Sequence, residues 1–194
     1  MTKIAIVDDL VLVAETLAEA LKSKYGEHIH AYSPENLDHR ILRNYDLLLL
    51  DFDFGALGNA NDLLNELERL EITDLKIILF SSFWKPQVLM VCRHPLVLGY
   101  FNKTYGLVDS FAAIDAVLAG KRWYQPQYAE EIKRLMKLPK SQVLTNRENE
   151  IVGLLQQGYS KPEVATELGI SINTVRNHVT HIFEKLGVNS IRQL

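Results

Sequence analysis

Residues 46–51 of this chain, Asp-Leu-Leu-Leu-Leu-Asp, form a continuous apolar run that ends at a carboxylate. A short run without alternation is typical of a strand that is covered on both faces, as in a parallel sheet. Four more short strands are predicted at residues 3–7, 28–32, 75–80 and 96–102, and a stretch of helical character follows each of the five. Strands that alternate with helices in this way predict an α/β fold, a doubly wound five-stranded parallel sheet, over residues 1–120.

The C-terminal part of the sequence predicts helices only. Thr145 and Glu148 have the spacing of a capping box, and so do Ser160 and Glu163. The second of these helices is short, and Gly169 permits a tight turn into a third helix, expected over about residues 172–186. We therefore expect a small all-α helix-turn-helix domain at residues 141–194, preceded by a linker, residues 121–140, that contains one short helix.

The two parts carry opposite net charge. Residues 1–119 hold 10 Lys and Arg against 17 Asp and Glu, a net charge of −7, whereas residues 120–194 hold 11 against 7, a net charge of +4. A basic helical part fits a nucleic-acid partner. The single cysteine, Cys92, excludes an intrachain disulfide and fits a reducing cytosol. No apolar stretch approaches membrane-spanning length, so we expect a cytoplasmic protein without a membrane partner.

Acidic residues follow two of the predicted strands. Asp8 and Asp9 come directly after the first strand, and Asp51 after the third. Ligands of an open α/β sheet bind beyond the carboxyl ends of its strands, so these side chains should lie close together. Clustered carboxylates repel one another unless a hard cation neutralises them, and Mg²⁺ prefers oxygen ligands. The sequence therefore predicts a Mg²⁺ site formed by the three carboxylates and completed by the backbone carbonyl of Asp53.

The same edge of the sheet has the residues needed to hold a phosphoryl group. Asp51 is the candidate nucleophile, and its attack on phosphorus would give an aspartyl phosphate. Ser81 follows the fourth strand and Lys103 the fifth, so a hydroxyl and an ammonium group can bind the phosphoryl oxygens. A lone Asp after a strand is more often a turn or capping residue. Four strand ends that all carry a suitable residue favour the functional interpretation.

Residues 4–9, 45–51, 76–81 and 99–103 resemble the receiver domain of two-component response regulators, which has a flavodoxin-like fold. The resemblance covers about residues 1–120. It implies that a sensor histidine kinase phosphorylates Asp51 and that Ser81 and Tyr100 form the switch that reports phosphorylation. Two positions depart from the family pattern: Gly55 stands where a proline-containing turn is usual, and Leu10 begins an apolar pair where polar residues are common. The first departure concerns the metal-site loop and the second the docking of partners.

The predicted third helix of the C-terminal part has two faces. Its apolar face should join the core, and its polar face carries Arg176, Asn177 and Thr180. Because a short helix and a glycine turn precede it, this helix is expected to enter the major groove of DNA. Arg can pair there with guanine, and Asn with adenine. The remaining candidates suit contacts to phosphate groups; they are Lys161, Thr174 and Lys185.

Residues 143–192 resemble the LuxR-type helix-turn-helix, and the whole chain resembles the NarL/FixJ class of response regulators. The resemblance places Arg176, Asn177 and Thr180 at base-facing positions and implies promoter DNA as a partner and a homodimer after phosphorylation. Domains of this family normally continue into a fourth helix that supports dimerisation. Since the chain stops at Leu194, that helix is barely begun: either it is truncated, which we expect, or this member of the family lacks it.

Two other functions fit part of the pattern. Asp51 and Asp53 resemble the motif of haloacid-dehalogenase phosphatases, in which two aspartates act as nucleophile and acid, but that family places its nucleophile near the N-terminus, ahead of its other metal-binding aspartates. A phosphorylation-independent DNA-binding regulator is disfavoured by the complete set of pocket residues. The sequence thus favours a phosphorylation-controlled transcriptional regulator that has no enzyme activity beyond its own phosphorylation and dephosphorylation.

Overall fold

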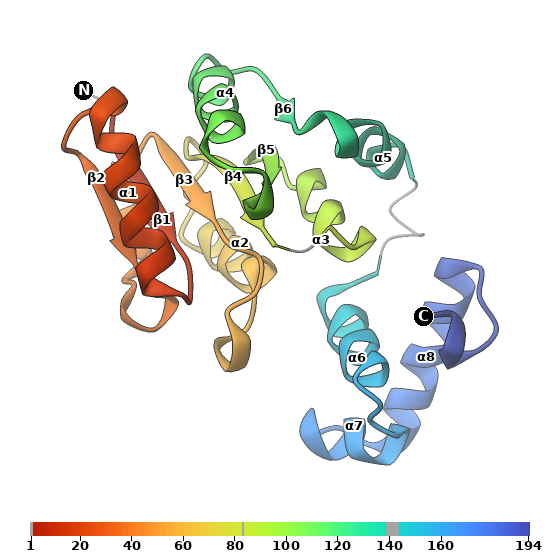
Figure 1. Ribbon diagram of the computed structural model, residues 1–194. Coiled ribbons are helices and arrows are strands. Elements are labelled where there is room, and N and C mark those ends of the chain that lie inside the picture. Colours follow the sequence, from red (N-terminus) through yellow and green to blue (C-terminus); the bar gives the residue numbers. More distant parts are fainter. Residues whose placement is uncertain (1, 83, 139–143) are drawn as a thin grey trace. The chain divides into compact units, whose positions relative to one another are not determined.

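The computed structural model describes residues 2–82, 84–138 and 144–194 (Figure 1). The chain divides into two compact units, Met1–Met136 and Lys137–Leu194. In the part of the chain that the structure describes, no helix is both long enough and apolar enough to cross a membrane.

The first unit is built around a parallel sheet. Its strands are β1 (Ile4–Val7), β2 (Ile29–Tyr32), β3 (Leu47–Leu50), β4 (Lys76–Ser81), β5 (Val97–Asn102) and β6 (Trp123–Tyr124), in the order β2-β1-β3-β4-β5-β6. The four leucines of β3 are fully buried between β1 and β4, as a strand covered on both faces requires. The predicted doubly wound parallel sheet is confirmed, but it has six strands where five were predicted.

Helices cover both faces of this sheet. They are α1 (Val11–Tyr25), α2 (Ala60–Arg69), α3 (Pro86–Met90), α4 (Leu107–Leu118) and α5 (Pro126–Met136). Residues of α1 and α4 share one core cluster with alternate residues of β1 and β3. The chain moves outward from β1 to β2 in one direction and from β3 to β5 in the other. Right-handed crossovers therefore place α1 on the opposite face from the helices that follow β3 and β4 (Figure 1).

Short 3₁₀ helices occupy several of the connections. They are η1 (Pro34–Asn36), η2 (His39–Asn44), η3 (Gly55–Leu57), η4 (Val91–Arg93) and η5 (Lys103–Tyr105). The helical stretch predicted after the strand at residues 28–32 consists of two 3₁₀ helices, η1 and η2, instead of an α-helix.

The segment predicted to be a linker belongs largely to the first unit. Trp123 and Tyr124 form β6, which pairs with Gly99 and Tyr100 of β5, and α5 buries Ile132 and other apolar side chains. A two-residue strand has too few residues to show a period, and its pairing depends on β5 rather than on its own sequence. The division between the compact units consequently falls after Met136, within the predicted linker.

The second unit is helical. It contains α6 (Asn146–Gln156), α7 (Lys161–Glu167) and α8 (Ile172–Leu186), followed by the 3₁₀ helix η7 (Ile191–Gln193). Both predicted capping boxes are present, at the starts of α6 and α7. The buried core consists of Ile151, Val152, Leu155, Val164, Ala165, Val175, Val179 and Ile182. Gly169 has φ +63°, which allows the chain to turn from α7 into α8.

Candidate phosphoryl and DNA-binding sites

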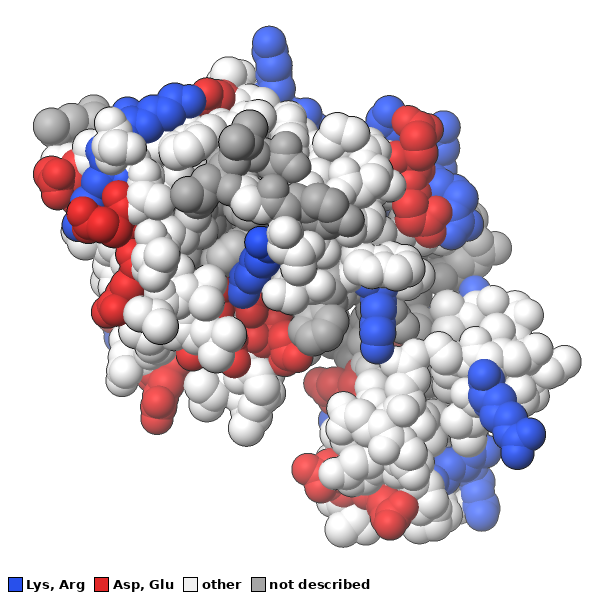
Figure 2. Space-filling model, in the orientation of Figure 1, with Lys and Arg blue, Asp and Glu red and all other residues white. Residues whose placement is uncertain are grey.

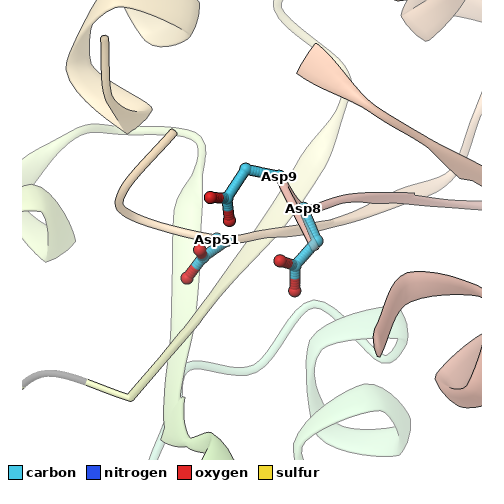
Figure 3. Close-up of side chains that lie close together, drawn as sticks. All are labelled: Asp8, Asp9 and Asp51. Atoms are coloured by element: carbon cyan, nitrogen blue, oxygen red, sulfur yellow. The ribbon is translucent and has the colours of Figure 1, made fainter. Parts of the chain in front are cut away.

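Three carboxylates meet at the carboxyl ends of β1 and β3. Asp8, Asp9 and Asp51 each offer an oxygen atom, and these atoms lie within 4.8 Å of one another (Figure 3). The pairing of Val7 with Leu50 sets the two strand ends side by side, and the Asp51 amide donates to the Val7 carbonyl at 2.9 Å. The predicted convergence of these acids is therefore present in the structure.

Lys103 lies against the same carboxylates. Its ammonium nitrogen is 2.6 Å from Asp8 Oδ2 and 3.1 Å from Asp51 Oδ1. It also lies 4.6 Å from the centre of the Phe80 ring, which covers the cation from the side of β4. One cation thus bridges two carboxylates of the cluster, in a position to meet an anion bound at Asp51.

The electrostatics of the cluster differ between its members. Burial raises the pKa of Asp51 to about 6; the Lys103 ammonium lowers this pKa and the Asp8 carboxylate raises it further. Burial also raises the pKa of the more exposed Asp9, and the neighbouring Asp8 adds to this shift. Each shift reflects the cost of holding several negative charges together in a partly desolvated site. A cation at this cluster would relieve that cost.

The loop after Asp51 is closed by its own hydrogen bonds. The Asp53 carboxylate accepts a bond from the Gly55 amide at 3.0 Å, and the Phe54 amide donates to the Gly58 carbonyl at 3.0 Å. Gly55 has φ +59°, a conformation that proline cannot adopt, which explains why this loop departs from a proline-containing turn. The Asp53 side chain is engaged in the turn. Its backbone carbonyl stays a predicted metal ligand.

The two predicted switch residues are both buried. Ser81 lies at the end of β4, between β3 and β5, and so at the same edge of the sheet as Asp51. Tyr100 is fully buried on β5, and its ring meets Tyr128 of α5 edge-on, with centroids 5.3 Å apart and planes at 86°. Sequence reasoning missed Tyr128, because the only signal, an aromatic residue in the presumed linker, does not say what it contacts.

The polar face of α8 is exposed. Arg176, Asn177 and Thr180 point away from the core that Val175 and Val179 join. Basic and acidic side chains both appear on the visible faces of the two units (Figure 2). The exposed face of α8 therefore offers side chains that can donate hydrogen bonds to base edges and to phosphate oxygens.

The three predicted phosphate contacts have different surroundings. Lys161 begins α7 and is partly exposed. Thr174 is exposed and lies 2.8 Å from the hydroxyl of Ser171, which caps α8. The ammonium group of Lys185 is 2.6 Å from the buried carboxylate of Glu148. In this conformation Lys185 is engaged within the unit, and a contact with phosphate stays a prediction.

Comparison with known proteins adds a family and several relatives. Residues 142–194 match the family described as "Bacterial regulatory proteins, luxR family". Among curated proteins, the transcriptional regulatory protein DesR of Bacillus subtilis is 32% identical over 149 residues, which cover 76% of this chain and 70% of DesR. The response regulator protein VraR of Staphylococcus aureus is 27% identical over 150 residues, which cover 76% of this chain and 71% of VraR.

Solved structures resemble the whole chain. RcsB from Salmonella enterica serovar Typhimurium, solved bound to a promoter in the presence of phosphomimetic BeF₃⁻, has a TM-score of 0.69 at 20% identity over 98% of this chain and 94% of that one. The response regulator ChrA of a heme-sensing two-component system has a TM-score of 0.52 at 23% identity over 98% and 92%. At these identities the likeness concerns the fold.

Proposed function

The chain belongs to the two-component response regulators of the NarL/FixJ class, which are transcriptional regulators controlled by phosphorylation, and we propose that Asp51 is its phosphoryl acceptor. A sensor histidine kinase would supply the phosphoryl group. The outcome would be a change in homodimerisation or in the binding of residues 141–194 to promoter DNA, in the cytoplasm.

One observation carries the assignment of Asp51: its carboxylate contacts the Lys103 ammonium group and lies in a cluster with two further carboxylates. In the reaction, an Asp51 oxygen would attack phosphorus while the bond from phosphorus to the donor's nitrogen or oxygen breaks. The donor would leave with the electron pair of that bond and take up a proton. Lys103 and the Ser81 hydroxyl would then hold the phosphoryl oxygens.

The oxygen donors of the cluster fit Mg²⁺, and Asp8, Asp9 and Asp51 would hold the ion with the Asp53 carbonyl. When bound, the ion would supply positive charge that offsets the charges of the acids and of the phosphoryl group. The chain's own residues hold the reacting groups in position. Asp8 keeps Lys103 in place through the 2.6 Å ion pair, and the 2.9 Å bond from the Asp51 amide fixes the nucleophile at the sheet edge.

DNA binding is assigned to α7 and α8. Arg176, Asn177 and Thr180 would read base edges, whereas Lys161, Thr174 and Lys185 would contact phosphates. Support comes from the exposed polar face of α8, from the match to the luxR family and from the fold shared with RcsB, whose structures include complexes with DNA.

The assignment of Asp51 is tested by incubating the chain with acetyl phosphate and Mg²⁺. The intact mass of the chain should rise by one phosphoryl group, and Asp51→Asn should abolish this adduct while binding DNA as the unphosphorylated chain does. A full adduct on the Asn variant would disprove the assignment. Phosphorylation should also change affinity for a promoter duplex. Turnover of an added phosphomonoester would point to a phosphatase, which the engagement of Asp53 in its own turn does not favour.

A further inference from the structure

The residue that precedes α5 clamps the end of β5. Gln125 is fully buried. Its backbone amide donates to the Tyr100 carbonyl at 3.0 Å, and its side-chain carbonyl accepts from the Asn102 amide at 2.9 Å. Because β6 ends at Tyr124, these two bonds extend the pairing of β5 beyond the last residue of β6. The backbone of β5 is thus held immediately before Lys103.

The Asn102 side chain joins three segments. Its nitrogen donates to the Ser82 carbonyl at 3.4 Å and lies 3.5 Å from the Tyr128 hydroxyl, while its oxygen accepts from the amide and the hydroxyl of Thr104 at 2.9 and 2.6 Å. The turn after β4, the turn that carries Lys103 and helix α5 therefore share one buried polar residue. Movement of either turn reaches α5 through it.

The contact between the rings of Tyr100 and Tyr128 also couples β5 to α5. Tyr100 is fully buried, and the Tyr128 ring meets it edge-on. Packed interiors have little free volume, so Tyr100 cannot change its position without displacing Tyr128. The other end of α5 is held separately, by a 2.9 Å bond from Arg93 to the Leu135 carbonyl. The first turn of α5 is consequently the part that contacts the switch strand.

We propose that Gln125 and Tyr128 are positioning residues that transmit phosphorylation of Asp51 to α5, an inference that rests on the proposed function. When Ser81 and Lys103 close on the phosphoryl group, they move the two turns that Asn102 joins. Tyr128 then loses its contacts with Tyr100 and Asn102. Release of α5 adds its 11 residues to the connection that leads into the second unit. Coupling is reciprocal, so weaker α5 contacts strengthen binding of a phosphoryl group.

The experiment uses the full chain with beryllofluoride and Mg²⁺. Binding is followed by ¹⁹F NMR, and amide hydrogen exchange is measured over residues 126–136. In the wild-type chain, beryllofluoride should speed exchange in α5 by about fivefold or more. Tyr128→Leu should show this faster exchange without beryllofluoride, and should bind beryllofluoride about fivefold or more tightly. Tyr128→Phe keeps the ring contact but loses the contact with Asn102, so both readouts should lie between those of the wild type and of Tyr128→Leu.

Tyr45→Leu is the matched control. It also removes a partly buried tyrosine ring, but this ring packs edge-on against Tyr32, away from α5, so neither readout should change. Unchanged α5 exchange in a wild-type chain that binds beryllofluoride would overturn the proposal, whether or not any variant folds. Faster exchange in Tyr128→Leu with unchanged beryllofluoride affinity would show that the contact between Tyr100 and Tyr128 is only structural. This result would also overturn the proposal. A wild-type chain without a bound ¹⁹F signal would instead refute the proposed function, and the inference with it.

Discussion

The ammonium group of Lys185 lies 2.6 Å from the carboxylate of Glu148 and joins the last turn of α8 to the first turn of α6. Glu148 also accepts the Thr145 amide at 2.6 Å, which closes the capping box. The acid stands at a helix N-terminus and the base near a helix C-terminus, so each is favoured by the local helix dipole. The pair is part of the scaffold that presents the polar face of α8.

Replacing Lys185 should therefore reduce stability as well as DNA binding. Lys185→Met leaves the buried Glu148 carboxylate without its cation, and the free energy of unfolding of the second unit should fall by about 1–3 kcal/mol. Amide exchange in α6 and α8 measures this loss. Lys161→Met is the control: it should lower the salt dependence of DNA binding without changing exchange. Equal stability of both variants would argue against a structural role for Lys185.

Acid should weaken the second unit through Glu148. Burial opposes ionisation of this carboxyl group, but hydrogen bonds from Lys185 and Thr145 outweigh it and leave its pKa below the usual value of 4.5. A group whose pKa is lowered by folding adds stability above its unfolded pKa and loses it as the pH falls through the folded value. Unfolding measured from pH 6 down to pH 3 should show this loss below about pH 4.5. Glu148→Gln should flatten the slope in that window.

Removing the cation beside Asp51 should slow phosphorylation. Lys103→Met deletes the group that lies 3.1 Å from the nucleophile, and the rate with acetyl phosphate should drop on the order of 10²-fold. Intact-mass time courses give the rate. Lys121→Met removes an exposed lysine and should leave it unchanged. Similar rates in all three proteins would exclude a direct role for Lys103.

Mg²⁺ binding should depend on Asp9. This carboxylate is exposed and lies within the acid cluster, so Asp9→Ala should weaken Mg²⁺ binding by roughly tenfold or more. Binding is followed during a Mg²⁺ titration by the fluorescence of Trp84, which is exposed in the connection that follows β4. Glu15→Ala, on the exposed surface of α1, serves as the comparison. Superimposable titrations of Asp9→Ala and wild type would place the ion elsewhere.

Arg176 should read sequence rather than charge alone. Arg176→Ala should cost about 1–3 kcal/mol against a specific duplex and relax base preference, whereas loss of a phosphate contact lowers the salt slope by about one for every sequence. Titration against specific and random duplexes at several salt concentrations separates the two effects. An equal loss on both duplexes would assign Arg176 to the phosphate backbone.

Much of the first unit could be predicted because its core strands are local patterns. The apolar run Leu47–Leu50 marks a strand covered on both faces, and the residues that follow β1, β3 and β5 mark where Asp8, Asp51 and Lys103 meet. Strand β6 could not be predicted, because two residues show no period and gain their partner only when β5 is in place.

The contact between the side chains of α6 and α8 could not be predicted from the sequence either. Lys185 lies on the polar side of an amphipathic helix, a pattern that fits DNA contact and an internal ion pair equally well, and Glu148 is 37 residues away. Leu186 has the spacing of a core residue, yet it is 42% exposed, because α8 reaches past the core at its last turn. Periodicity reports which face is apolar but not how far the neighbouring helices extend along it.

Strand β6 also determines where the first unit can be cut. Gly99 lies close to β6: an added Cβ would be 3.2 Å from the Trp123 carbonyl, which is tighter than an ordinary contact. A fragment that stopped at residue 120 would leave the outer backbone groups of β5 unpaired at this point and uncover the apolar surface beneath α5. An unprotected sheet edge is a template for pairing with other chains, so such a fragment should aggregate, whereas one that continues to Met136 should not.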